Sequence, residues 1–131
     1  FMKLCHPFLK GGGKIINLAS SSALRADSEG YGAYAAVKEA IRALSRTAAV
    51  EWGPDSILVN CIMPLAKSTG MEWWMNERPE EAAEFVKTIP LGRVGDCKDD
   101  IGEAVCHLLS EGMSYITGST IMIDGGQAFL R

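Results

Sequence analysis

Three short apolar runs constrain the fold of this chain most strongly. They span residues 14–18, 56–63 and 119–123, and helical patterns separate them. Short apolar runs of this kind are typical of parallel strands that are buried on both faces. Strands that alternate with helices along a chain form a parallel sheet. We therefore predict an α/β fold with about three parallel strands and flanking helices, within a single domain over residues 1–131.

Helical patterns fill much of the chain between these runs. Residues 1–10 have helical spacing, and the apolar residues that would share one face are Phe1, Leu4, Cys5, Phe8 and Leu9. Residues 33–52 form a longer helix that Gly53 and Pro54 end. Its many alanines allow a second helix to approach closely. The residues near one face of it are Ala33, Val37, Ala40, Ile41, Leu44, Ala48 and Glu51.

Two further helices are indicated by their first residues. Pro79, followed by two acids, suits the first turn of a helix that runs to about Thr88. Asp96 is a good N-cap for a later helix, with Asp99 three residues on as in a capping box. The segment 68–78 forms either a flexible apolar lid over a substrate or an ordinary packing or oligomer contact. Its large apolar side chains are Met71, Trp73, Trp74 and Met75.

Composition excludes several classes of protein. The net charge is −3 and no basic stripe is present, which argues against a nucleic-acid-binding protein. No apolar run approaches the length of a membrane helix, so we expect no membrane partner. The four cysteines lack C-x-x-C spacing and are expected to be free thiols in a reducing cytoplasm. Two histidines without a nearby acidic or cysteine pattern make a poor metal site, so we assign no metal.

Tyr34 and Lys38 lie four residues apart near the start of the long helix. This spacing stacks the two side chains on one helix face. An ammonium close to a phenol favours the ionised phenol, and such a group can pass a proton to or from a substrate oxygen. The serines at 20–22 supply hydroxyls that can hold this oxygen in place. An isolated pair at this spacing is usually a surface pair, so the functional interpretation depends on the motifs around it.

Six short motifs give the chain a resemblance to the short-chain dehydrogenases/reductases, and more specifically to members that resemble 3-oxoacyl carrier protein reductases. Their order and spacing match over nearly the whole chain. The resemblance implies the second half of one domain with a partial Rossmann-like, doubly wound parallel sheet. The motifs are Asn17-Leu-Ala-Ser20, Tyr34-Ala-Ala-Val-Lys38, Val59-Asn60, Gly92-Arg-Val-Gly95, Tyr115-Ile-Thr-Gly118 and Asp124-Gly-Gly126.

The catalytic residues implied by the resemblance are Tyr34, Lys38 and one serine. Tyr34 is implied to be the general acid/base, and Lys38 to support it and hold the nicotinamide ribose. The serine would bind the reacting oxygen. Counting from Asn17 gives Ser20, whereas counting back from Tyr34 gives Ser21. We prefer Ser20 because the strand fixes its direction, and we assign Asn17 a supporting role at most.

The same resemblance implies cofactor contacts in the loop after the second strand. Lys67 takes a position that commonly holds an aliphatic residue beside the nicotinamide, and Thr69 falls where a threonine often lies near the cofactor amide. The family usually has glycine after the proline. This chain has Leu65, whose Cβ disfavours a positive φ and puts the loop conformation in doubt. With NAD or NADP as the implied cofactor, the binding residues are Tyr34, Lys38, Pro64, Lys67 and Thr69.

The resemblance implies an oxidoreductase that transfers a hydride between NAD(P) and a small alcohol or carbonyl substrate. It also implies a homo-oligomer, either a dimer or a tetramer. The Gly-rich strand–turn–helix that holds the dinucleotide in family members is missing, because Gly11–Gly13 precedes a strand. We therefore expect the N-terminal cofactor-binding half to be absent and this chain alone to be inactive. The alternative is a truncated non-catalytic remnant or oligomerisation module.

Overall fold

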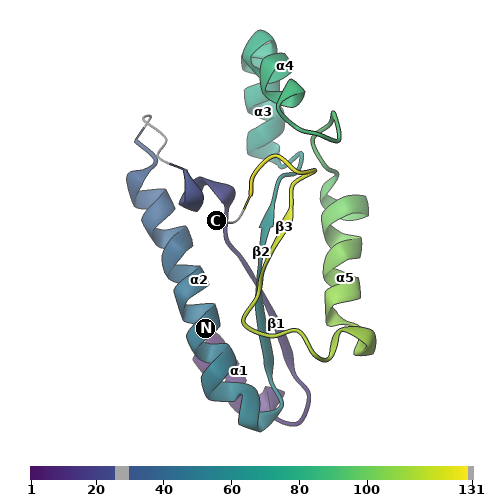
Figure 1. The fold of residues 1–131 in the computed structure, drawn as a ribbon. Helices are drawn as coiled ribbons and strands as arrows, with labels where there is room; N and C mark the ends of the chain where they lie inside the picture. The colour runs from purple at the N-terminus through teal and green to yellow at the C-terminus, as the bar shows by residue number, and fades with distance from the viewer. Residues whose placement is uncertain (26–29, 130–131) are drawn as a thin grey trace.

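The computed structural model describes residues 1–25 and 30–129. The polar loop predicted at residues 25–30 lies largely outside the described residues. Within the described part, three strands form one parallel sheet in the order β1-β2-β3 (Figure 1). The strands are β1 (Lys14–Leu18), β2 (Leu58–Pro64) and β3 (Thr120–Ile123). The predicted parallel α/β sheet is confirmed.

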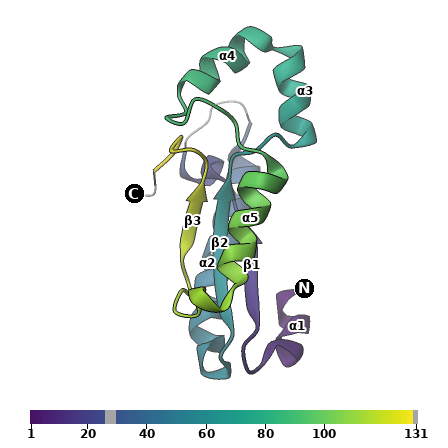
Figure 2. The same cartoon turned by 90° about the vertical axis from the view of Figure 1, so that its right-hand side faces the viewer.

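Helices cover both faces of the sheet. Helices α1 (Met2–Leu9) and α2 (Gly32–Trp52) lie on one face, and α5 (Glu103–Leu109) lies on the other (Figures 1 and 2). A π-helical turn at Cys97–Gly102 leads into α5. Helices α3 (Thr69–Glu77) and α4 (Pro79–Lys87) lie beyond the carboxyl ends of the strands. The sequence pattern did not predict α3 as a helix. Ser68 begins it, because its side chain accepts a hydrogen bond from the Met71 N–H.

The central strand carries the core. Residues Val59 to Met63 of β2 are all buried, as the apolar run predicts for a strand with a neighbour on each side. On the α1 and α2 side, Val59 packs in a cluster with Ile57, Ala48 and Ala49. Towards the carboxyl end of the sheet, Cys61 and Met63 pack against Ala19. Small residues of α2 therefore lie against the sheet, and this contact fixes the position of the helix relative to β1 and β2.

Two predicted helix faces are wrong in detail. In α1, the apolar residues divide: Leu9 packs on the core with Met2, while Phe1, Leu4 and Phe8 point outward. In α2, the predicted face also divides, because Ala48 is buried while Val37 and Leu44 are 59% and 63% exposed. The face turned to the sheet includes the predicted Ile41 and Ala48, together with Ser45, Ala49 and Trp52, which were not predicted.

Two of the sequence motifs have structural explanations. The buried amide of Asn60 donates from Nδ2 to the Ile116 carbonyl at 2.7 Å, and its Oδ1 accepts the Ser119 N–H at 3.1 Å. The Thr117 hydroxyl accepts the Val59 N–H at 3.0 Å. Three hydrogen bonds therefore join the Val59-Asn60 pair to the loop before β3. They give the buried Asn60 amide a partner on each side.

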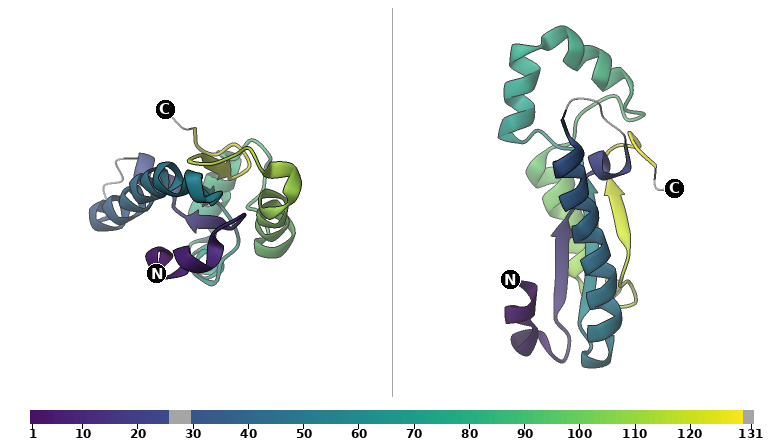
Figure 3. Two further views of the ribbon diagram at one scale, coloured as in Figure 1. Left: turned by 90° about the horizontal axis from the view of Figure 1, so that it is seen from below. Right: turned by 90° about the vertical axis from the view of Figure 1, so that its left-hand side faces the viewer.

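Strand β1 pairs with β2 along one edge only, among the described residues. Leu18, its last residue, is 54% exposed. In Figure 3, β1 lies at one side of the sheet, with α1 close to its amino end. No described helix has the length and apolar character needed to cross a membrane.

Candidate active site

Ser20 lies directly beyond the carboxyl end of β1. The Ala19 N–H donates to the Ile62 carbonyl at 2.8 Å, and Ala19 itself is buried, so the backbone that leads to Ser20 is fixed by β2. The Ser20 Oγ accepts the Ser22 N–H at 3.2 Å and caps a 3-10 turn at Ser21–Leu24. Because this bond uses Oγ as an acceptor, the hydroxyl proton is left to donate to another oxygen.

Tyr34 and Lys38 lie in the first two turns of α2, as their spacing predicts. The Lys38 ammonium lies 5.5 Å from the centre of the Tyr34 ring. It also donates to the Leu18 carbonyl at 3.0 Å, which attaches α2 to the last residue of β1. Tyr34 is 45% exposed, so its phenol is open to a molecule bound at this edge of the sheet. The structure thus places Tyr34 and Lys38 beside the strand end that leads to Ser20.

The Tyr31 and Tyr34 rings meet at nearly a right angle, with their centres 5.9 Å apart. Tyr31 is 46% exposed and has no lysine four residues after it. Its contact orients the Tyr34 ring through an edge-to-face pair. The two tyrosines therefore form a natural pair for comparison, since they are similarly exposed and only Tyr34 has a cation above its ring.

The loop after β2 brings the other predicted residues to the same edge of the sheet. Pro64 is the last residue of β2, and Thr69 is the first residue of α3. Ser56 is the only described residue other than glycine with a positive φ, so Leu65 enters this loop without backbone strain. The doubt raised by Leu65 is therefore removed. The Lys67 N–H donates to the Gly95 carbonyl at 2.9 Å, and its side chain is exposed.

Sequence reasoning gave Asn17 only a possible supporting role and overlooked its partner Ser45. The Asn17 Nδ2 donates to the Ser45 Oγ at 2.8 Å and lies 3.0 Å from the Met2 sulfur. Ser45 is 1% exposed, and its hydroxyl donates to the Ile41 carbonyl at 2.7 Å. Asn17 therefore connects β1 to both α1 and α2. A polar residue on the sheet-facing side of an alanine-rich helix was the signal for Ser45.

Asp100, and not Asp99, completes the cap that the sequence pattern predicted at Asp96. Asp96 does cap the helix, because its Oδ1 accepts the Lys98 and Asp99 N–H groups. In return, the Asp96 N–H donates a hydrogen bond of 2.6 Å to the Asp100 carboxylate, and not to Asp99. The π-helical turn explains the shift, because it adds one residue to the first turn. Asp100 also forms a bidentate ion pair with Arg93.

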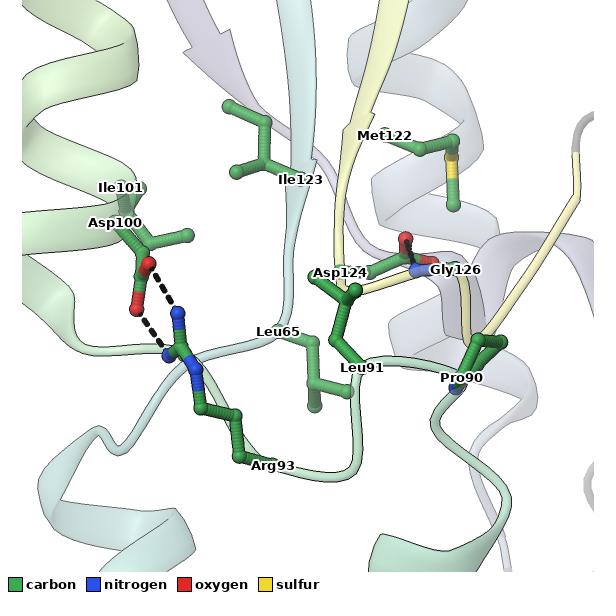
Figure 4. Close-up of a pocket in the computed structure, with 12 residues that line it drawn as sticks. Leu65, Pro90, Leu91, Arg93, Asp100, Ile101, Met122, Ile123, Asp124 and Gly126 are labelled. Atoms are coloured by element: carbon green, nitrogen blue, oxygen red, sulfur yellow. Dashed lines mark hydrogen bonds and ion pairs between the residues drawn. The ribbon is translucent and has the colours of Figure 1, made fainter.

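A cavity of about 490 Å³ lies at the carboxyl end of β3, and its lining does not include Ser20, Tyr34 or Lys38 (Figure 4). Its polar groups already have partners. The Asp124 carboxylate accepts the Gly126 and Ala128 N–H groups, and Arg93 is paired with Asp100. The Arg93 guanidinium holds the pKa of Asp100 far below its usual range. The charged side chains that line this cavity are therefore engaged in structural contacts.

The described cysteines form no disulfides, which confirms the predicted free thiols. Burial raises the pKa of the Cys61 thiol, which keeps it in the neutral form. Within residues 1–25 and 30–129, no group of three or more histidine, cysteine and acidic side chains is placed to hold a metal ion.

Comparisons with known proteins agree with this architecture. A family described as enoyl-(acyl carrier protein) reductase matches residues 1–128. The chain belongs to the short-chain dehydrogenase/reductase family. The 12alpha-hydroxysteroid dehydrogenase of a Clostridium species is 41% identical over 127 residues, which are 96% of this chain and 49% of the relative. A 3-oxoacyl-(acyl carrier protein) reductase of Chlamydia trachomatis is 41% identical over 124 residues, or 94% of this chain and 48% of the relative.

Solved structures show the same relationship. A short-chain dehydrogenase/reductase from Brucella melitensis superposes with a TM-score of 0.87 at 28% identity, covering 98% of this chain and 51% of that one. Levodione reductase gives a TM-score of 0.80 at 30% identity, covering 96% of this chain and 50% of that one. The chain therefore spans about half the length of the relatives that it matches.

Proposed function

We propose that this chain forms the second half of an oxidoreductase domain and supplies the acid/base residues for hydride transfer between NAD or NADP and an alcohol or carbonyl substrate. The observation that carries the proposal is the Lys38 ammonium, which lies beside the Tyr34 ring at the end of β1. The family membership and the names of the relatives support a reaction of this class.

In the direction of carbonyl reduction, Tyr34 donates the phenolic proton to the substrate oxygen. The Ser20 hydroxyl donates a hydrogen bond to the same oxygen, which holds it near the phenol. Ser21 is the alternative residue for this role. The Lys38 ammonium stabilises the phenolate that remains after proton transfer. In the reverse direction, this phenolate accepts the proton of the alcohol.

The residues present suit the nicotinamide end of the cofactor, which supplies or accepts the hydride. A lysine ammonium has three donors, and the hydrogen bond from Lys38 to the Leu18 carbonyl uses one of them. The remaining donors suit ribose hydroxyls. Pro64, Lys67 and Thr69 border the same edge of the sheet, and we propose that they contact the cofactor. Because the Lys67 N–H already donates to Gly95, its carbonyl and side chain are the groups that remain for this contact.

We further propose that the dinucleotide phosphates are held by a segment that precedes these residues in the complete protein. Such a segment would also cover the outer edge of β1, where Leu18 is exposed. We expect a homo-oligomer, since the exposed apolar side chains of α2, including Val37 and Leu44, suit a contact with a second copy. We retain the cytoplasm as the proposed location.

The test of the proposal is a Tyr34→Phe variant of the complete protein, with Tyr31→Phe as the matched control. The substrates are a panel of hydroxysteroids, ketosteroids and 3-oxoacyl thioesters with each nicotinamide cofactor. We expect Tyr34→Phe to lower kcat by a factor of about 100 or more, with NAD(P)H affinity nearly unchanged. We expect Tyr31→Phe to remain active. Full turnover by Tyr34→Phe would refute the acid/base role, and a wild-type protein that binds no NAD(P)H would favour the non-catalytic remnant.

A further inference from the structure

The loop after β2 is held in place by main-chain bonds to Gly95. The Gly95 N–H donates to the Leu65 carbonyl at 3.2 Å, and the Lys67 N–H donates to the Gly95 carbonyl at 2.9 Å. Ala66 and Gly95 thereby form an isolated parallel bridge. On its other side, the Leu65 N–H donates to the Ile123 carbonyl at 2.9 Å. The loop at 64–69 is thus positioned by Gly95 and Ile123, which both lie far later in the chain.

Glycine is required at position 95 for this approach. A Cβ at this position would lie 2.9 Å from the Leu65 carbonyl oxygen and 3.5 Å from the Asp100 side chain. Two backbone segments therefore touch at Gly95 without side chains between them. Any movement of Gly95 is passed directly to Leu65 and Lys67, because no flexible side chain absorbs it.

The Asp100 carboxylate fixes the backbone next to Gly95. It accepts the Asp96 N–H at 2.6 Å, and Arg93 binds it with two parallel bonds of 2.5 and 2.7 Å (Figure 4). Arg93 and Asp96 lie on either side of Gly95 in the chain, so one carboxylate holds both flanks of this glycine. The planar fork of arginine sets direction as well as distance, which a single charge contact does not.

We propose that the Arg93–Asp100 pair is a positioning device for the cofactor-binding loop at 64–69. The chain of contacts runs from the ion pair to Gly95, and from Gly95 to Lys67 and the start of α3. This inference rests on the proposed function, which assigns the loop to the nicotinamide end of the cofactor. Neither Arg93 nor Asp100 is assigned a contact with the reacting atoms.

The solvent exposure of the Arg93–Asp100 pair indicates that it positions the loop more than it stabilises the whole fold. The Arg93 and Asp100 side chains are 56% and 31% exposed, and an ion pair this open to water adds little to global stability. The main consequence of removing it is therefore a less ordered loop in a protein that remains folded. Arg78, the N-cap residue of α4, and Glu81 in the first turn of that helix form a comparably exposed pair outside the loop at 64–69, and they provide a matched control.

The experiment compares Arg93→Gln, Arg93→Lys and Asp100→Asn with the control Arg78→Gln, all in the complete protein. Fluorescence titration with NADH or NADPH gives the dissociation constant, and thermal unfolding without cofactor gives Tm. We expect Arg93→Gln and Asp100→Asn to weaken cofactor binding by about tenfold, because a misplaced loop loses its contacts. Arg93→Lys should recover part of this loss. The Tm values should match that of Arg78→Gln.

The possible outcomes separate this inference from the proposed function. Unchanged cofactor affinity in Arg93→Gln and Asp100→Asn would overturn the positioning role while leaving the proposed function intact. A fall in Tm well beyond that of Arg78→Gln would show a structural role and would also overturn the inference. A wild-type protein that does not bind NADH or NADPH would refute the proposed function itself. Weaker binding at unchanged Tm, with partial recovery in Arg93→Lys, supports the inference.

Discussion

Two lysines lie near opposite ends of β1. Both donate to main-chain carbonyls, but they differ in how many of their N–H donors remain unused. Lys14, at the amino end, donates to the Leu109 and Ser110 carbonyls at 3.0 and 2.6 Å and lies 3.9 Å from the Glu111 carboxylate. Lys38, at the carboxyl end, donates to one carbonyl, that of Leu18. Two carbonyls take two of the three donors of the Lys14 ammonium and the Glu111 carboxylate neutralises its charge, whereas Lys38 uses one donor and lies above the Tyr34 ring.

The difference agrees with our proposal that the carboxyl edge of the sheet serves chemistry, while the amino edge serves structure. Near the amino edge, polar side chains are bound to main-chain groups. The Asn60 amide donates to the Ile116 carbonyl, and the Thr117 hydroxyl accepts the Val59 N–H. At the carboxyl edge, Ser20 keeps its hydroxyl proton, and Tyr34 is open to solvent. Ligands of open parallel sheets bind beyond the carboxyl ends of the strands, which agrees with this distribution.

The largest expected effect comes from Lys38→Met, which removes the ammonium and keeps the apolar stem. We expect kcat of the complete protein to fall by a factor of about 100 or more, because the phenolate loses its neighbouring positive charge. Cofactor affinity should fall as well, in contrast to Tyr34→Phe. Steady-state kinetics and NAD(P)H titration measure the two effects. A variant with normal turnover would contradict the role assigned to Lys38.

Lys14→Met tests the other end of the comparison. We expect it to lower the free energy of unfolding by about 2 kcal/mol, since two carbonyls lose a charged hydrogen-bond donor. Turnover per folded molecule should stay unchanged. Urea unfolding and an activity assay on the same sample check both statements. A Lys14→Met protein that is stable but inactive would reverse the assignment of the two edges.

The smallest expected effect concerns Asp55, which ties α1 to the start of β2. Its carboxylate lies 3.2 Å from the Lys10 ammonium and 2.8 Å from His6 Nε2, and His6 lies against the Trp52 ring. The hydrogen bond from Lys10 is the main cause that lowers the pKa of Asp55. A lowered folded-state pKa stabilises the protein above the unfolded-state value, and this stabilisation is lost as the pH falls through the folded-state pKa.

We therefore expect Asp55→Asn to be slightly less stable than wild type at neutral pH. The difference should disappear below about pH 4, where the wild-type carboxyl becomes protonated in the unfolded chain and then in the folded one. Tm measured across this pH range checks the prediction. A difference that grows as the pH falls would contradict it.

The sequence predicted the bounds of an element well where local residues alone determine them. β1 has the predicted bounds, because its apolar run is short and a Gly-rich turn precedes it. The faces of α1 and α2 were harder to predict, since each helix carries more apolar residues than one contact can cover. Phe8 and Val37 are exposed in this structure although both belong to apolar faces. Which part of such a face turns to the sheet depends on the tertiary packing.

The sequence predicted which candidate residues lie together, but not the contacts that hold the loop beside them. The spacing of Tyr34 and Lys38 fixed their common face because both lie on one helix. The bonds from Gly95 to the loop at 64–69, and from Asp100 to Asp96, join segments that the sequence does not bring together. The π-helical turn also moved the capping bond from Asp99 to Asp100, and local patterns do not reveal a turn of this kind.

The most direct test of the central claim follows the hydride itself. The complete protein is incubated with NADH or NADPH carrying deuterium at the transferable position of the nicotinamide, together with the carbonyl substrates of the panel. Mass spectrometry of the products then shows whether deuterium has moved. We predict one deuterium on the carbinol carbon of the product with wild-type protein and almost no labelled product with Tyr34→Phe. Cofactor binding without any labelled product from the panel, or equal labelling by both proteins, would contradict the account.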